Sequence, residues 1–101
     1  MDKHDFKPDT RCMLTWRDEA ARLRPLGLYV FRACDTFLVG RQTAGTGCLR
    51  RVAYADIARI VDARAAAPAD RLAVPGALLE EKHWRDRAVL EHYSSSPALG
   101  K

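Results

Sequence analysis

Two adjacent runs of strand-forming residues constrain the fold of this chain more than any other feature. Residues 28–33 (LYVFRA) and 36–41 (TFLVGR) are rich in β-branched and aromatic side chains, and the Cys34-Asp35 pair between them suits a tight turn. They predict a β-hairpin. Residues 48–53 (CLRRVA) predict a third strand, which follows the flexible loop GRQTAGTG.

Both faces of the predicted hairpin are apolar. With a two-residue turn, one face holds Tyr29, Phe31 and Leu38, and the other holds Val30, Phe37 and Val39. Two short helices cannot easily cover both faces. One face therefore needs a C-terminal helix, a second copy of the chain or another partner, and the sequence leaves these alternatives open. A homodimer through the C-terminal helix or the second sheet face is among them.

Helices are predicted on either side of these strands. Residues 16–24 carry apolar side chains at helical spacing and end at Pro25, and residues 54–67 place Ile57, Ile60 and Val61 at helical spacing. Residues 77–93 are rich in helix formers. The expected fold class is α+β, a small three-stranded antiparallel sheet packed with two to three helices, in the order α-β-β-β-α-α.

The length of 101 residues is enough for one domain. We expect a flexible N-terminal arm at residues 1–13, a single α+β domain at 14–93 and a flexible tail at 94–101. The start of the chain has no apolar run of the kind a secretory signal needs, and no uncharged stretch approaches the ~20 residues that span a bilayer. The three cysteines have no CxxC spacing, which favours free thiols. These features predict a cytoplasmic protein with no membrane partner.

The basic charge lies in the first half of the chain. The net charge is +4, and residues 11–51 hold eight arginines against three acidic residues, a local balance of +5. Arg32 and Arg41 share a hairpin face with Phe37, and Arg50 and Arg51 lie nearby if the third strand pairs with the second. Single-stranded nucleic acid binds such surfaces by stacking its bases on aromatic rings while arginines hold its phosphates. In the alternative interpretation the aromatic rings are core and the arginines a solvated rim.

The order of segments between residues 14 and 64 also points to a class of proteins. Pro25-Leu26-Gly27 runs into LYVFRACDTFLVGR, followed by a short strand and a helix. In this order and composition the chain resembles short accessory proteins carried by bacterial prophages and other mobile elements. The resemblance carries no catalytic motif, so it assigns no functional residue.

Catalytic motifs are absent from the sequence. His83 and His92 are nine residues apart, which on a helix turns them to opposite sides, and no cysteine has a histidine close in sequence. The loop GRQTAGTG lacks the lysine and the serine or threonine of a phosphate-binding Walker loop. We therefore expect no enzyme, no cofactor and no metal site.

Trp84 is the remaining candidate. On a helix it would lie away from the main apolar stripe, either packed on a neighbouring loop or exposed as an anchor for a partner.

These observations predict a small non-enzymatic binding protein, a phage or mobile-element accessory factor, that binds nucleic acid through a basic hairpin face. The candidate binding residues are Arg32, Phe37, Arg41, Arg50, Arg51 and Trp84. The alternative is a protein-targeted inhibitor or adaptor, for example an anti-CRISPR-type blocker of a host defence complex. A basic face would suit that function by binding an acidic protein patch.

Overall fold

A computed structural model describes residues 6–44, 47–93 and 96–97 of the chain. Its main feature is a six-stranded antiparallel sheet in the order β5-β1-β2-β3-β4-β7, beside a two-stranded sheet of β6 and β8. The strands are β1 (Thr10–Arg17), β2 (Leu23–Ala33), β3 (Phe37–Gln42), β4 (Leu49–Ala53), β5 (Ile57–Ala65), β6 (Leu72–Ala73), β7 (Val89–Leu90) and β8 (Ser96–Pro97). The helical segments among the described residues are all short 3₁₀ turns, and none is an α-helix. The predicted α+β class is therefore wrong, and the protein is mostly β.

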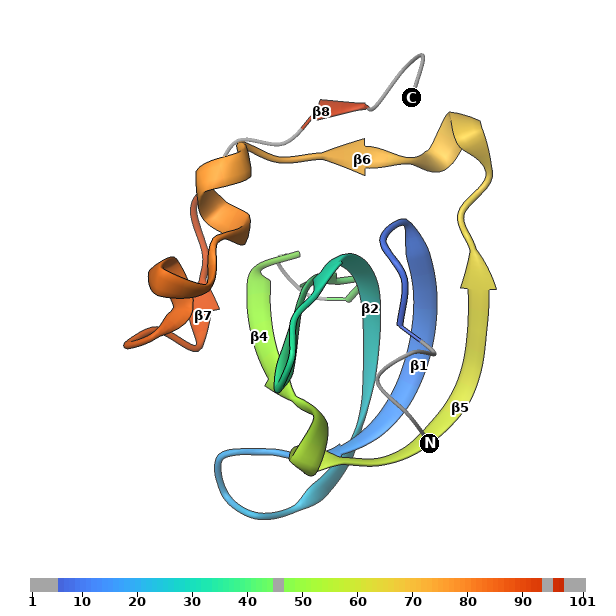
Figure 1. Cartoon of the computed structure of the whole chain (residues 1–101). Coiled ribbons are helices and arrows are strands. Elements are labelled where there is room, and N and C mark those ends of the chain that lie inside the picture. The colour runs from blue at the N-terminus through green and yellow to red at the C-terminus, as the bar shows by residue number, and fades with distance from the viewer. Residues whose placement is uncertain (1–5, 45–46, 94–95, 98–101) are drawn as a thin grey trace.

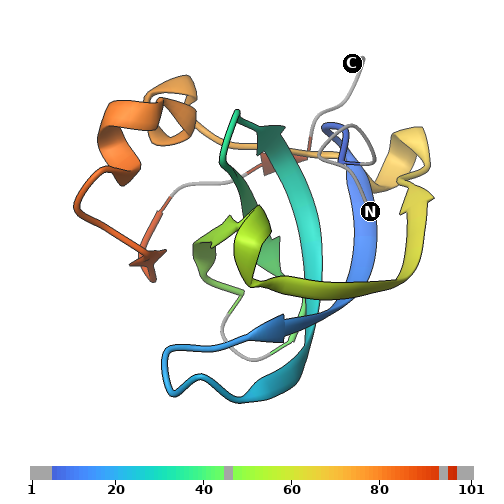
Figure 2. The same ribbon diagram turned by 60° about the horizontal axis from the view of Figure 1, so that its bottom comes forward.

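The connectivity explains how one short chain forms a curled sheet. Strands β1 to β4 follow one another as a meander, and a 3₁₀ turn (Tyr54–Asp56) leads into β5, which returns to pair with β1. The sheet curls with the β1–β2 turn at one end and β6 crossing at the other (Figures 1 and 2). A fold by itself does not define a function, so the function has to be argued from the site.

The first predicted helix, residues 16–24, is wrong because its residues form the end of β1, a turn and the start of β2. Strand β1 alternates strictly: Cys12, Leu14 and Trp16 are buried, whereas Arg11 and Arg17 are exposed. The segment predicted as a loose arm contributes Phe6 to the core and residues 10–13 to β1.

Asp18 closes the β1–β2 turn. Its Oδ1 accepts hydrogen bonds from the backbone N–H groups of Ala20 at 2.9 Å and Arg22 at 3.0 Å, and its Oδ2 lies 2.7 Å from Nε of Arg24. Ala21 takes the left-handed conformation with φ of 60°. An aspartate that folds back on its own backbone in this way favours a turn over a helix.

These contacts make the turn sensitive to pH. The N–H of Arg22, joined by that of Ala20 and by the Arg24 guanidinium, holds the pKa of Asp18 below its usual value of 3.8. A lowered folded-state pKa contributes stability above pH 3.8, and this stability is lost as the pH falls through the folded-state value. We expect Asp18→Ala to lower the urea midpoint at pH 7, with a smaller deficit below pH 3.8. Asp18→Asn keeps the acceptor oxygen and should lose less. An Asp18→Ala deficit that stays constant with pH would contradict this account.

The second predicted helix, residues 54–67, is wrong because two β-bulges in β5 imitate helical spacing. Ile57 lies opposite Trp16 and Ile60 opposite Leu14, and register shifts at both steps leave Ala58 and Val61 as the extra residues. Ile57 and Ile60 therefore both face inward, although they are three residues apart. A flat strand would have turned them to opposite faces.

The third predicted helix, residues 77–93, is wrong as well. The segment forms two 3₁₀ turns (Gly76–Leu79 and Glu81–Trp84) and β7. Trp84 is completely buried, and its Nε1 donates a 2.6 Å hydrogen bond to the carbonyl of Leu78. Of the tail predicted at 94–101, Ser96–Pro97 forms β8 against β6, and the remainder lies outside the described residues.

The hairpin prediction is confirmed, with a changed register. Ala33 pairs with Leu38 instead of Thr36, and a bulge around Phe31 shifts the pairing again, so that Val30 lies opposite Gly40. The consequence is two separate cores. One lies inside the curl with Leu28, Val30, Leu38, Leu14 and Phe6. The other lies on the outer face of the sheet, around Tyr29 and Trp84.

The second core answers the question of what covers the second sheet face. Tyr29, Phe31, Val39 and Leu49 pack against Trp84 and against partly buried side chains of the C-terminal segment, namely Leu72, Val74, Leu78, Leu79, Leu90 and Tyr93. The chain covers this face itself, as Figure 1 shows for the segment from β6 to β7. The predicted C-terminal helix is absent from the described residues, and this sheet face is covered within the chain.

Candidate functional site

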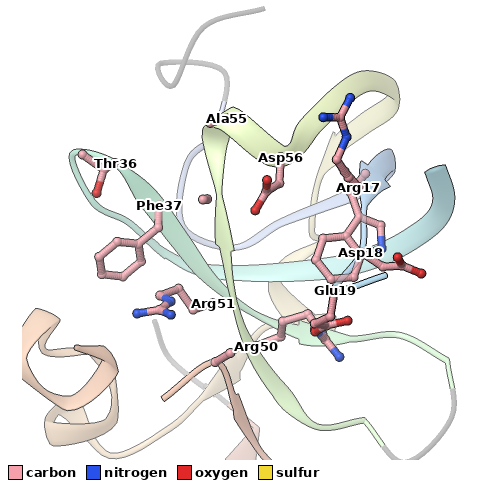
Figure 3. Close-up of a pocket in the computed structure, with 12 residues that line it drawn as sticks. Arg17, Asp18, Glu19, Thr36, Phe37, Arg50, Arg51, Ala55 and Asp56 are labelled. Atoms are coloured by element: carbon pink, nitrogen blue, oxygen red, sulfur yellow. The ribbon is translucent and has the colours of Figure 1, made fainter. Parts of the chain in front are cut away.

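Three of the six predicted binding residues line one pocket. Phe37, Arg50 and Arg51 meet in an open pocket of about 430 Å³, here called the Phe37 pocket, between the β1–β2 turn, the β2–β3 turn, β4 and the 3₁₀ turn before β5. The pocket is also lined by Thr36, Trp16, the alanines Ala53, Ala55 and Ala88, and four further charged residues. Figure 3 shows Phe37 and Arg51 on one side of β4, and Asp18 and Glu19 on the other.

Charge in the Phe37 pocket is balanced. Its positive side chains are Arg17, Arg50 and Arg51, and its negative ones are Asp18, Glu19 and Asp56. The guanidinium of Arg50 lies 4.9 Å from the Trp16 ring and 2.7 Å from the carboxylate of Glu19. Arg51 lies 6.0 Å from the Phe37 ring and donates to the carbonyl oxygen of Trp84. Two of the three arginines are thus held by contacts within the chain.

The other three predicted residues lie elsewhere. Arg32 is exposed and donates a 3.0 Å hydrogen bond to the carbonyl of Leu79. Arg41 lies on the outer face of β3, beside Gly47 and opposite Tyr29. Trp84 lies in the second core, so of the two alternatives it is packed and not an exposed anchor.

Another arginine cluster, which the sequence analysis did not select, lies on the outer face of β1 and β5. Arg11 and Arg17 point outward from β1. In β5, Arg59 lies opposite Thr15, and Arg64 lies opposite Arg11. Opposed residues of an antiparallel pair share a face, so Arg11, Arg17, Arg59 and Arg64 form one surface, here called the outer arginine face.

Two acidic residues, Asp62 and Asp70, lie beside Arg11 and Arg64 at one end of this surface. Asp62, opposite Met13, lies on the same face and pairs with Arg64 at 3.1 Å. Among the described residues, the side chains of Arg11, Arg17 and Arg59 have neither an ion pair nor a hydrogen bond. Arg11 directly opposite Arg64 is a like-charge pair, which destabilises a sheet unless an anion lies nearby.

The signal for this surface is present in the sequence. Residues 10–17 (TRCMLTWR) alternate between inward side chains and outward polar ones, which is typical of a half-buried strand. The helix predicted from Trp16 onward cut this alternating pattern short, so the strand was not recognised. The β5 arginines were hidden by the same bulges that imitated a helix.

Metal-binding side chains do not cluster in the described residues. No group of three His, Cys, Asp or Glu side chains that could hold a metal ion is present there. Cys12, Cys34 and Cys48 are free thiols and are buried. Burial raises the pKa of Cys12 to about 11, and burial also raises the pKa of Cys34. The described part of the chain holds no helix that is long and apolar enough to cross a membrane.

No family model, curated protein or solved structure matches this chain. The structure itself describes the protein as a small curled antiparallel sheet with a pocket at one end and a basic face on β1 and β5. The resemblance to accessory proteins of mobile elements, the absence of enzymatic activity and the cytoplasmic location stay predictions.

Proposed function

We propose that this is a non-enzymatic nucleic-acid-binding protein whose phosphate-contacting surface is the outer arginine face. The observation that supports this most is the group of three arginines, Arg11, Arg17 and Arg59, with no partner among the described residues. Unpaired guanidinium groups on one exposed face are available to phosphates without breaking a contact within the chain.

This proposal moves the contact surface away from the hairpin. Arg50 and Arg51 would have to leave Glu19 and the Trp84 carbonyl to bind a phosphate, and Arg32 would have to leave the Leu79 carbonyl. Breaking such contacts subtracts from the binding free energy.

Salt dependence and a matched pair of variants test the proposal. Each phosphate contact on a single strand contributes a log–log slope of roughly −0.7, so three contacts predict about −2, or roughly a 20-fold loss of affinity between about 50 and 200 mM salt. We expect the triple variant Arg11→Gln, Arg17→Gln, Arg59→Gln to lose this salt-dependent binding. Fluorescence anisotropy with labelled single strands and duplexes measures it.

The control removes the same charge from another place. Arg22→Gln, Arg85→Gln, Arg87→Gln also lowers the net charge from +4 to +1, and these exposed side chains have no partner among the described residues either. Equal losses in both triple variants would show that only net charge matters and would overturn the assigned surface. If neither the single strands nor the duplexes bind at about 0.15 M salt, the nucleic-acid proposal is wrong. The remaining candidate function is then a protein-targeted inhibitor or adaptor.

A further inference from the structure

We infer that the Phe37 pocket is a subsite for one nucleobase of a single strand held on the outer arginine face, preferentially a base with an exocyclic amino group. This inference rests on the proposed function and assigns the pocket a ligand that differs from the phosphate backbone.

The balance of charge in the pocket argues for a neutral ligand. Three carboxylates accompany the three arginines and Glu19 already pairs with Arg50, so the interior of the pocket offers a phosphate no net positive charge. A nucleobase carries no charge and offers both donors and acceptors along its edge. Its flat ring also suits an opening walled by aromatic side chains.

Phe37 provides the stacking surface. The ring is only partly buried, and Arg51, lying 6.0 Å from it, is held in place by its hydrogen bond to the Trp84 carbonyl. The surface on which a base can stack is the part of the Phe37 ring that stays exposed beside Arg51. Trp16 is less accessible, because it is buried and Arg50 lies over its ring.

Two polar side chains remain for the edge of the base. Asp56 and Thr36 line the pocket and are exposed, and their side chains have no hydrogen bond or ion pair among the described residues. A carboxylate accepts a hydrogen bond from the amino group of cytosine or adenine. Thymine has no exocyclic amino group. The two carbonyl oxygens beside its ring N–H would be repelled by the Asp56 carboxylate.

Arg17 connects the pocket to the outer arginine face. It is an outward residue of β1 and also lines the pocket (Figure 3). From Arg11 to Arg17 the strand rises about 20 Å at roughly 3.3 Å per residue. Several phosphates of one strand can follow this row before a base reaches Phe37.

The test compares three oligomers of equal length: oligo-dC, oligo-dT and an abasic strand that carries the phosphates alone. We expect oligo-dC to bind more tightly than oligo-dT, and both more tightly than the abasic strand. Phe37 also packs against the second core, and Phe37→Leu keeps an apolar side chain there. We expect this variant to weaken oligo-dC binding roughly 5- to 150-fold with an unchanged salt slope. Asp56→Asn, at an exposed position, should reduce the preference for dC over dT.

A thermal melt of each variant checks that it is folded, and Asp56→Asn decides the matter if Phe37→Leu is unfolded. If all three oligomers bind equally and the salt slope still depends on Arg11, Arg17 and Arg59, the pocket inference fails and the proposed function survives. If none of them binds, both fail. Binding of a protein partner that Phe37→Leu abolishes, without any oligomer binding, would assign the pocket to a peptide instead.

Discussion

Replacing Trp84 with alanine is expected to lower the free energy of unfolding by about 3–5 kcal/mol, the usual cost of removing a fully buried aromatic side chain. Trp84 is the largest completely buried side chain of the second core, and its removal also leaves the Leu78 carbonyl without its 2.6 Å hydrogen bond. Since small domains are stable by about 5–15 kcal/mol, this loss is a large part of the total. Urea denaturation followed by circular dichroism measures it.

Two variants complete the Trp84 experiment. Trp84→Phe keeps most of the apolar volume and loses the hydrogen bond, so its loss should be clearly smaller than that of alanine. Leu23→Ala, at a side chain that is 59% exposed, should change the stability by less than about 0.5 kcal/mol. If Trp84→Ala costs no more than Leu23→Ala, the C-terminal segment does not cover the second sheet face.

Gly40→Ala is expected to destabilise the sheet by about 1–3 kcal/mol, because the added methyl group has no room. A Cβ on Gly40 would lie 2.8 Å from the backbone carbonyl oxygen of Tyr29 on the neighbouring strand. A backbone atom cannot rotate away as the end of a side chain can. Gly40 lies in β3, between Val30 of β2 and Arg50 of β4, so a shift there has to be shared by three strands.

Gly76→Ala is the matched control for this substitution. Nothing lies within 4 Å of a Cβ at Gly76, which begins a 3₁₀ turn. Alanine there should be neutral or should stabilise by about 0.4–1 kcal/mol, because it reduces the freedom of the unfolded chain. Thermal melts should therefore show a lower midpoint for Gly40→Ala and an unchanged or higher midpoint for Gly76→Ala. A stable Gly40→Ala protein would mean that β2 and β3 are not as close as described.

The hairpin and β4 were predictable because their residues combine high strand propensity with clear turn signals. Residues 28–33 and 36–41 fall within β2 and around β3, and residues 48–53 match β4 to within one residue. The bulge near Phe31 was not predicted, because the run 28–33 contains no glycine and the glycine beside the bulge, Gly40, lies on the opposite strand.

The helices were mispredicted for a physical reason that differs between segments. In β5 the bulges at Ala58 and Val61 change a two-residue alternation into a three-residue spacing. In residues 77–93 the helix propensity is overridden, since Trp84 and Leu90 are drawn to the apolar outer face of β2 to β4. Intrinsic propensity is a weak preference that tertiary packing readily outweighs.

Only the part of the candidate site that lies on strands adjacent in sequence could be predicted. Arg51 and Phe37 meet because β3 and β4 are paired, as the hairpin analysis predicted. Trp16 and Asp56 join them because β1 is distant in sequence yet pairs with β5. No local pattern contains that pairing.

By itself, the sequence determined the central β-hairpin, the strand after it and the excess of basic charge in the first half, because these depend on residues close together in the chain. Only the tertiary structure decided which arginines are held by carbonyl and carboxylate groups and which remain available on β1 and β5. That outcome depends on the pairing of β5 with β1 and on the C-terminal segment that covers the outer face. Both are long-range contacts, and burial of apolar surface selects them over the local preferences of the segments involved.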